Sequence, residues 1–205
     1  MLTIHHLRVG RSIFTVWLLE ELELEYELKE YYRHPETNRS PPELKNIHPL
    51  GKSPVIDDDG LVLSESGAIA SYLLKKHDPQ HKLSPASSDL GRWAQYNQWL
   101  HYPEGSVFTP LLIQLLLLRS GVEAPLFNAY SSAELTLHLD HITAQLADNS
   151  YILGAQFSAA DIGVCYMLSM AASLGLLSQY SSLNDYVARN KQRPAFLRAL
   201  ERGVE

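Results

Sequence analysis

The chain has 205 residues, of which 45% are hydrophobic and 20% are charged, so it is long enough and apolar enough to bury a sizeable core. Its formal net charge of −6 argues against nucleic acid and anionic membrane surfaces, and we expect small molecules and proteins as its partners. The single cysteine, Cys165, cannot form an internal disulfide, which predicts a reduced, cytoplasmic location.

Residues 1–78 alternate between strand and helix patterns. Residues 2–7 have the pattern of an apolar strand, residues 12–22 that of an amphipathic helix, and residues 25–32 alternate with the period of a strand. A strand, a helix and a strand in this order form a β-α-β unit, in which the two strands are parallel.

A second pair of strands is expected after a loop rich in Pro and Asn. Residues 54–66 place two short apolar runs around Asp-Asp-Gly, which is typical of an antiparallel hairpin. A helix then runs from Ser64 or Glu65 to about His77. Together with the β-α-β unit, this order predicts a small α/β sandwich with four strands.

The character of the sequence changes after this half. Residues 79–87 concentrate Pro, Ser and His and resemble a linker, and everything that follows has helical periodicity. The sequence therefore predicts an α/β domain over residues 1–78 and an all-α domain over residues 88–205. The expected helices of the second domain span residues 88–119, 128–148, 158–172, 182–191 and 195–202.

Three local features of the helical half lead to further expectations. Pro103 and Pro110 should kink or split the first helix. The longest apolar stretch, residues 110–118, is too short to cross a membrane, so we expect a buried helix there. Ser158 and Asp161 have the spacing of a capping box, and we interpret them as a helix cap with no further role.

The corner "IHHLRVGRSIFTVW" (residues 4–17) contains candidate polar groups where a strand passes into a helix. His5 and His6 are neighbours on the strand, so their side chains point to opposite faces and cannot hold one metal ion together. We expect a structural role for both histidines and no metal cofactor. Cys165 lies among apolar helix residues and is expected in the core.

The segment "GKSPVI" (residues 51–56) opens a strand with a proline, which cannot donate to a strand ladder. A cis bond between Ser53 and Pro54 would turn the backbone of Ser53 outward. The amide and carbonyl of Ser53 could then pair with a peptide-like ligand, as a strand edge does. Lys52 supplies a point charge suited to a carboxylate.

The segment "SESGAI" (residues 64–69) begins a helix, whose N-terminus favours carboxylates. Glu65 could accept a hydrogen bond from a ligand ammonium group, and Ser66 could donate to a ligand carboxylate. With Ser53 and Lys52, this set fits a short peptide that has a free amino-acid end. The alternative is a plain N-cap with an acidic first turn.

The chain resembles the cytosolic glutathione S-transferases over essentially its whole length. The resemblance is carried by "HHLRVGRSIFTVWLLEELELEYELKEYYR", "SPPELKNIHPLGKSPVIDDDGLVLSESGAIASYL" and "FSAADI". It implies a thioredoxin-like N-terminal domain, an all-α C-terminal helical domain, a homodimer and glutathione as co-substrate. It also implies ligand contacts for the Ser53 backbone and cis-Pro54 at the cysteinyl part, Glu65 and Ser66 at the γ-glutamyl end, and Lys52 at the glycyl carboxylate.

The corner departs from the serine-type branch of this family. Relatives carry a serine where this chain has Gly10, so the usual hydroxyl beside the glutathione thiol is missing. Lowering a thiol pKa from about 8.5 to about 6.5 requires about 2.7 kcal/mol of thiolate stabilisation. Hydrogen bonds to charged groups contribute about 1.5–3 kcal/mol and a helix N-terminus up to ~2 kcal/mol. Ser12, or a backbone amide at residues 11–12, with Arg11 nearby, is the predicted catalytic replacement.

We predict a glutathione transferase that conjugates glutathione to a small hydrophobic electrophile, a reaction that implies a role in detoxification. Two alternatives stay open: a glutathione-binding or regulatory module without transferase activity, and a glutathione-dependent peroxidase or disulfide reductase. An electrophile pocket could be lined by residues of the helical domain, although plain helix packing would explain each of them equally well. These residues are Tyr102, Phe108, Leu111 and Leu112.

Overall fold

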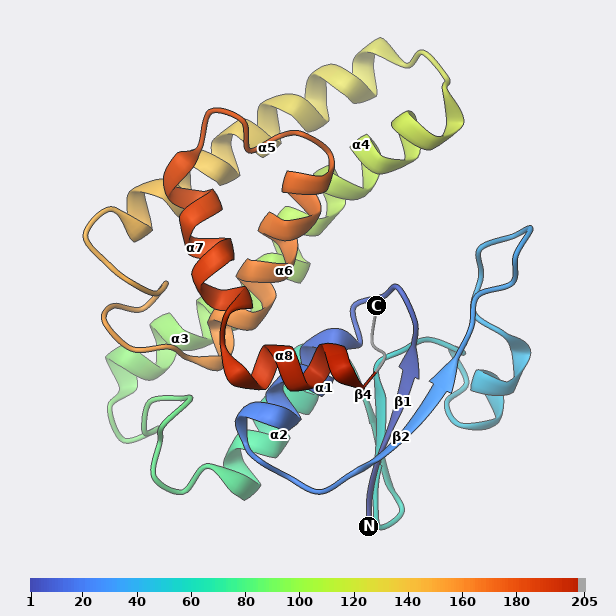
Figure 1. The fold of residues 1–205 in the computed structure, drawn as a ribbon, viewed down its shortest axis with the longest axis vertical. Helices are drawn as coiled ribbons and strands as arrows, with labels where there is room; N and C mark the ends of the chain where they lie inside the picture. The colour runs from blue at the N-terminus through green and yellow to red at the C-terminus, as the bar shows by residue number, and fades with distance from the viewer. Residues whose placement is uncertain (203–205) are drawn as a thin grey trace. The chain divides into compact units, whose positions relative to one another are not determined.

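A computed structural model describes residues 1–202 of the chain, which form two compact units (Figure 1). The first unit contains residues 1–80 together with the segment that begins at Gln192, and the second contains residues 81–191. The first unit thus includes the last helix of the chain, which the sequence had placed in the helical domain. None of the helices in residues 1–202 is long and apolar enough to cross a membrane.

The first unit is built on a four-stranded sheet. Its strands are β1 (Leu2–Leu7), β2 (Glu27–Tyr31), β3 (Val55–Asp58) and β4 (Leu61–Ser64). The strand order is β2-β1-β3-β4, with β1 parallel to β2 and antiparallel to β3, and with β3 and β4 in an antiparallel hairpin. This arrangement confirms the predicted α/β topology and is that of a thioredoxin-like domain.

The backbone of the turn between β3 and β4 explains why the Asp-Asp-Gly sequence correctly predicted a hairpin. Asp59 and Gly60 both have positive φ, at 53° and 92°, the backbone of a two-residue turn that matches the twist of the flanking strands. Gly60 tolerates this conformation because it has no Cβ, and its amide donates to Asp57 Oδ1 at 2.8 Å.

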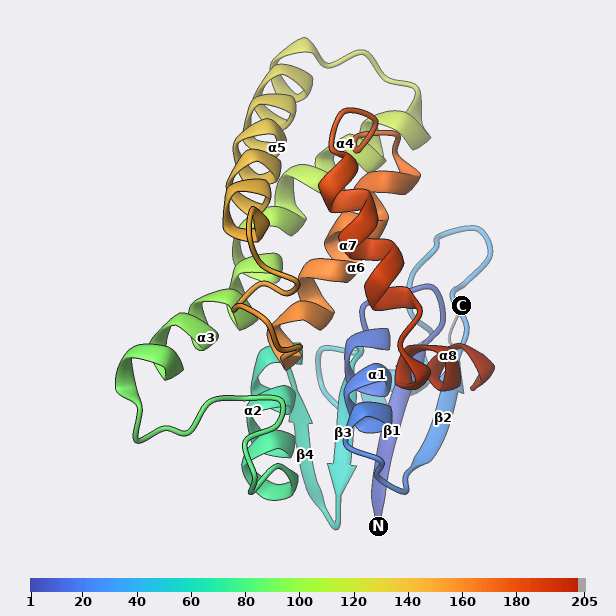
Figure 2. The ribbon, with the colours of Figure 1, turned by 60° about the vertical axis from the view of Figure 1, so that its left-hand side comes forward.

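Among its described residues, the first unit also has four helical segments: α1 (Ile13–Glu21), a 3₁₀ turn η1 (Pro42–Asn46), α2 (Ser66–His77) and α8 (Pro194–Glu201). α1 packs against α2 and β1, and α8 packs against α1 (Figure 2). Contrary to the amphipathic pattern expected for it, α1 is buried from Ile13 to Glu20, because α8 covers its outer side. Trp17 meets Phe196 edge to face, with ring centroids 4.8 Å apart.

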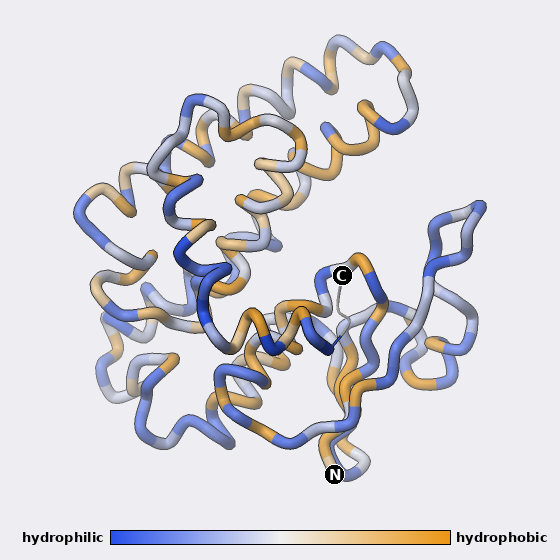
Figure 3. The backbone as a smooth tube through the Cα atoms, viewed as in Figure 1, coloured by the Kyte–Doolittle hydropathy of each residue, from blue (hydrophilic) through white to orange (hydrophobic). Residues whose placement is uncertain are grey.

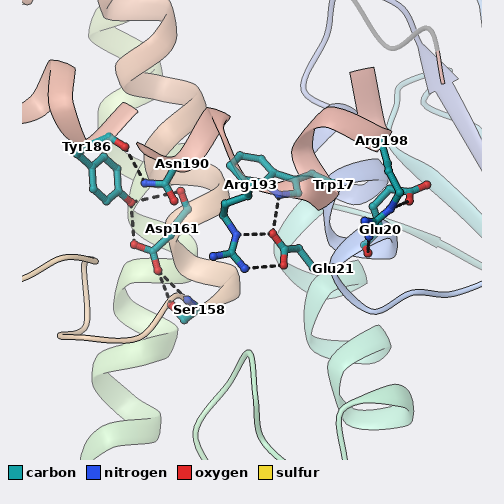
Figure 4. Close-up of polar contacts among 9 residues, drawn as sticks. All are labelled: Trp17, Glu20, Glu21, Ser158, Asp161, Tyr186, Asn190, Arg193 and Arg198. Atoms are coloured by element: carbon teal, nitrogen blue, oxygen red, sulfur yellow. Dashed lines mark hydrogen bonds and ion pairs between the residues drawn. The ribbon is translucent and has the colours of Figure 1, made fainter. Parts of the chain in front are cut away.

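Paired charges also hold α8 on α1. Arg193 donates to both carboxylate oxygens of Glu21, at 2.6 and 2.7 Å, and Trp17 Nε1 donates to the same carboxylate at 2.9 Å (Figure 4). Glu20 is buried and accepts from Arg198 Nε at 2.9 Å. The C-terminal helix is therefore part of the structure that fixes α1.

The second unit is entirely helical, as predicted. Its segments are α3 (Leu90–Tyr102), a π-helical turn η2 (Pro103–Val107), α4 (Phe108–Ser120), α5 (Pro125–Leu146), α6 (Ala159–Ser173) and α7 (Ser181–Lys191). The predicted helix over 88–119 is split at Pro103, as expected. Pro110 does not split α4, which continues directly from η2, where the Phe108 amide donates to the Pro103 carbonyl.

Asp161 has a larger role than the helix cap expected from the sequence. Its carboxylate accepts from the backbone amide of Ser158 at 2.8 Å and from the Ser158 hydroxyl at 3.0 Å, which confirms the capping box at the start of α6. It also accepts from Ile152 N at 2.8 Å and from Tyr186 Oη at 2.7 Å (Figure 4). One carboxylate thus joins α6 to the preceding loop and to α7.

Candidate active site

The strand register brings the three predicted segments of the site to one end of the sheet. His5 on β1 lies opposite Val55 on β3, and Val55 lies opposite Ser64 on β4. The corner that follows β1, the residues that precede β3 and the start of α2 therefore share the same end. All three belong to the first unit.

The corner between β1 and α1 explains the glycine at position 10. A Cβ on Gly10 would lie 2.9 Å from the Leu7 carbonyl oxygen, closer than real Cβ contacts allow, and 3.2 Å from Arg33 Nη2. A serine could occupy this position only if the backbone moved. The hydroxyl expected at this position in the serine-type branch is therefore incompatible with the present path of the corner.

Arg33, which sequence reasoning missed, supports the corner from the loop after β2. Its Nη2 donates to the Val9 carbonyl at 3.1 Å, and its Nη1 donates to the Asn38 carbonyl at 3.1 Å. Val9 itself has a positive φ of 53°, an uncommon conformation for a β-branched residue. No local pattern around Arg33 indicated this contact, because it links positions 24 residues apart.

Ser12 is fully buried, and its hydroxyl points to the end of β1. Ser12 Oγ lies 2.8 Å from His6 Nδ1. It accepts a hydrogen bond from the Leu7 amide at 3.2 Å, and it can donate one to the Leu7 carbonyl oxygen, also at 3.2 Å. The hydroxyl therefore belongs to the interior of the corner. A direct hydrogen bond from Ser12 to a glutathione thiolate, as the sequence suggested, does not fit this placement. Arg11 is half-buried at the same corner.

The bond between Ser53 and Pro54 is cis. Ser53 Oγ donates to the His5 carbonyl at 2.7 Å and accepts from Leu7 N at 3.1 Å, so its side chain is fixed against β1. The ladder of β3 begins only at Val55, which leaves the Ser53 backbone outside it. Lys52 is exposed beside it.

The start of α2 has a strained backbone. Glu65 has φ 72° and ψ 118°, a conformation that costs a residue with a side chain about 1–3 kcal/mol and is concentrated at ligand-binding sites. Its side chain is exposed and makes no capping hydrogen bond to α2, so the plain side-chain N-cap considered as the alternative is not present. Ser66, half-buried, is the first residue of the helix.

The two histidines of β1 are part of the scaffold, as expected. Both are buried, and His5 Nδ1 lies 2.9 Å from Tyr31 Oη. Burial lowers the pKa of His5, with Lys29 contributing in the same direction. Within residues 1–202, no group of three or more His, Cys, Asp or Glu side chains is placed to hold a metal ion. Cys165 is buried in α6, and burial raises the pKa of its thiol to about 12.

The four predicted pocket residues lie in the second unit and differ in exposure. Leu111 is fully buried, whereas Phe108 and Leu112 are half-buried. Tyr102 Oη lies 2.7 Å from His138 Nδ1 on α5, and burial raises the pKa of Tyr102 to about 12. Leu111 is therefore a core residue of this unit.

Comparison with known proteins identifies the chain's relatives. The N-terminal domain family of glutathione S-transferases matches residues 2–75, and the C-terminal domain family matches residues 133–189. Glutathione S-transferase 3 of Schizosaccharomyces pombe is 36% identical to the chain, in an alignment that covers 98% of the chain and 88% of that protein. Glutathione S-transferase 1 of Saccharomyces cerevisiae is 34% identical, with coverages of 93% and 88%.

A solved structure gives the same result. A glutathione S-transferase from Actinobacillus pleuropneumoniae superposes with a TM-score of 0.89 at 34% identity, covering 98% of this chain and 92% of that one. A thioredoxin-like domain followed by a helical domain defines the class. The chain belongs to the glutathione S-transferase family. Its activity is that of a glutathione transferase, with glutathione as co-substrate.

Proposed function

We propose that the end of the sheet described above binds glutathione and holds its sulfur as a thiolate for attack on a small hydrophobic electrophile. The observation that carries the proposal is the strand register, which gathers the corner, the Ser53–Pro54 step and the start of α2 in one place. Binding aligns the sulfur with the electrophile, so the catalysis rests on proximity and on thiolate stabilisation.

Each binding group has a proposed partner on glutathione. The amide and carbonyl of Ser53, shaped by cis-Pro54, pair with the cysteinyl part as a strand edge does. Glu65 accepts from the γ-glutamyl ammonium group, and Ser66 at the N-terminus of α2 binds the γ-glutamyl carboxylate. Lys52 binds the glycyl carboxylate; its exposure leaves the ammonium group accessible.

Thiolate stabilisation is assigned to the corner at residues 10–12. Arg11 and the N-terminal end of α1 are the positive groups there. Their combined stabilisation of a thiolate is large enough to lower a thiol pKa by about 2 units. Ser12 contributes by fixing the corner, because its hydroxyl is buried. The assignment replaces the direct Ser12 donor considered from the sequence.

The electrophile is proposed to contact the partly exposed members of the predicted pocket set, Tyr102, Phe108 and Leu112. Their aromatic and aliphatic surfaces suit a hydrophobic substrate. Detoxification of such compounds in the cytoplasm is the proposed role. A peroxidase or disulfide-reductase reaction uses the same thiolate and no protein cysteine, so it is a second outcome that the test below separates.

The test combines three measurements on the purified chain. Retention on glutathione-agarose reports binding, an absorbance titration reports the pKa of the bound thiol, and a chlorodinitrobenzene assay reports conjugation. We expect binding, a thiol pKa well below its free value and turnover. Binding with an unshifted pKa and no turnover would make the chain a binding module; activity only with hydroperoxides or mixed disulfides would assign the alternative reaction.

The proposed assembly is a homodimer. Support comes from the family and from exposed apolar side chains around the hairpin of α4 and α5, where Figure 3 shows long hydrophobic stretches along α4. Several exposed apolar side chains grouped on one helical hairpin are typical of an interaction site. These side chains belong to Leu116, Leu118, Val122, Leu126, Phe127 and Tyr130.

A further inference from the structure

A buried polar pair lies directly beneath the corner that is proposed to hold the glutathione sulfur. His6 on β1 and Ser12 before α1 are both fully buried, and His6 Nδ1 is 2.8 Å from Ser12 Oγ. Buried polar groups are expensive to leave unpaired, so each side chain holds the other in place. Neither side chain has a direct role in the proposed glutathione contacts.

The hydrogen-bonding capacity of Ser12 explains what the pair fixes. Its oxygen accepts from the amide of Leu7 at 3.2 Å, and its single proton can go to the Leu7 carbonyl at 3.2 Å or to His6 Nδ1. In the first case a protonated Nδ1 of His6 donates to Ser12; in the second, Ser12 donates to His6. Both arrangements anchor the start of α1 to the end of β1.

Ser12 is an unusual residue to find before a helix without capping it. It occupies the N-cap position of α1 but makes no side-chain cap hydrogen bond, because its hydroxyl is turned back toward β1. The Ser12 hydroxyl therefore ties the residue before the helix to β1 and to His6. The backbone of residues 9–12, which joins β1 to α1, is therefore constrained by the same contact.

The same strand end also anchors the other side of the site. The Leu7 amide is shared between Ser12 Oγ, at 3.2 Å, and Ser53 Oγ, at 3.1 Å. Ser53 in turn donates to the His5 carbonyl at 2.7 Å. The corner for the sulfur and the segment for the cysteinyl backbone are thus fixed on one peptide group of β1.

From this geometry we infer that His6 is a positioning residue for thiolate stabilisation, acting through Ser12. His6 does not touch glutathione; it sets the position of the corner on which Arg11 and the N-terminus of α1 depend. The inference rests on the proposed glutathione site. It predicts that substitution of His6 changes the pKa of the bound thiol, whereas substitution of an ordinary core residue does not.

The experiment compares His6→Phe, which keeps a ring and removes the nitrogen, with His6→Asn, whose amide can occupy the place of Nδ1. For His6→Phe we expect the pKa of bound glutathione to rise by about one unit, from about 6.5 to about 7.5, and turnover near pH 6.5 to fall about fivefold, because the thiolate fraction falls from about one half to about one tenth. The KM for glutathione should change less than about threefold, since the groups that bind its backbone are intact. His6→Asn should restore most of the loss.

Ser12→Ala tests the same link from its other end. We expect it to raise the thiol pKa by a similar amount, and the double variant His6→Phe/Ser12→Ala to add little, because both changes remove one interaction. Tyr31→Phe is the matched control: it removes the phenol beside His5, on the other face of β1, and should leave the thiol pKa unchanged.

The outcomes separate this inference from the function on which it rests. If the wild-type chain neither binds nor conjugates glutathione, the proposed function fails. If the wild type is active and folded His6→Phe keeps the wild-type thiol pKa, the positioning role is refuted. Should His6→Phe fail to fold, Ser12→Ala alone decides the question, with an unchanged thiol pKa counting against the inference.

Discussion

At the scale of single residues, Gly10 and Glu65 are opposite cases: Gly10 stands where a side chain does not fit, and Glu65 has a side chain where the backbone conformation favours glycine. Gly10 is required because a Cβ would collide with the Leu7 carbonyl oxygen at 2.9 Å. Glu65 carries a side chain in a conformation that favours glycine, with φ 72°, and this strain of about 1–3 kcal/mol must be offset by the surrounding structure. A carboxylate kept at such a position is expected to have a function.

Two substitutions at Glu65 separate its charge from its backbone. We expect Glu65→Gln to raise the KM for glutathione about tenfold or more, because a charge-assisted hydrogen bond to the ammonium group is worth about 1.5–3 kcal/mol. Glu65→Gly should raise the KM similarly while the melting temperature stays the same or rises, since glycine relieves the positive φ. Steady-state kinetics and thermal unfolding measure the two effects.

Glu25→Gln is the control for this prediction. Glu25 is exposed and precedes β2, at the end of the sheet away from the corner. Its substitution should change neither the KM nor the melting temperature. An unchanged KM in Glu65→Gln would instead assign the γ-glutamyl contacts to Ser66 and the start of α2.

Some residues of the proposed site could be singled out from the sequence and others could not, for a physical reason. Ser53, Pro54, Glu65 and Ser66 were predicted because proline at a strand start and polar residues at a helix start are local signals. The contact of Arg33 with the corner and the inward placement of the Ser12 hydroxyl were not predicted. Both depend on which distant backbone atoms lie nearby, and no local pattern encodes that.

At the scale of elements, α8 determines the environment of α1. The Arg193–Glu21 pair is bidentate, and the Glu21 side chain is only 7% exposed. Removing one partner of such a pair leaves a charge that is neither paired nor hydrated. The pair therefore matters more for stability than an ion pair on the surface would.

We expect Arg193→Met to lower the free energy of unfolding by about 2–4 kcal/mol, because it leaves the Glu21 carboxylate buried without its cation. Adding Glu21→Gln should recover part of the loss by removing the stranded charge. Urea unfolding followed by circular dichroism measures both. The control is Lys29→Met, which breaks an exposed pair with Glu27 and should cost less than about 1 kcal/mol. Equal losses in Arg193→Met and Lys29→Met would contradict a clamping role for α8.

The amphipathic pattern expected for residues 12–22 failed for a reason at this same scale. Polar residues at the end of α1 suggested a solvent-facing side, but Glu20 and Glu21 are paired with arginines of a segment more than 170 residues away. A charged residue in a helix is predicted to be exposed when the local sequence contains no partner for it. Here the partners are distant arginines, so the carboxylates are buried instead.

At the scale of the whole molecule, the exposed apolar side chains of α4 and α5 bear on the proposed homodimer. Leu126 is 78% exposed and Phe127 is 58% exposed at the start of α5. Isolated exposed apolar residues are common, but several on one hairpin indicate a surface that another molecule covers. In a homodimer with twofold symmetry, the same surface would be used by both copies.

The prediction is that the wild-type chain is a dimer and that Phe127→Glu weakens it at least tenfold, because an unpaired carboxylate at an interface is costly to desolvate. Sedimentation velocity over a range of concentrations measures the shift. Leu61→Glu, on the edge strand β4, is the matched control and should remain dimeric. A monomeric wild type would refute the dimer, and a Phe127→Glu variant as tightly dimeric as the control would place the interface elsewhere.

By itself the sequence determined the four-stranded α/β unit, its parallel crossover pair and antiparallel hairpin, the hairpin turn, the capping box and the division into an α/β and an all-α part. These features follow from periodicity and from the backbone preferences of Pro, Gly and Asp, which are local properties. Only the tertiary structure decided that the last helix covers α1, that Ser12 faces inward to His6, and that Arg33 supports the corner. Such contacts depend on which segments meet in space, and burial and pairing between distant residues set them.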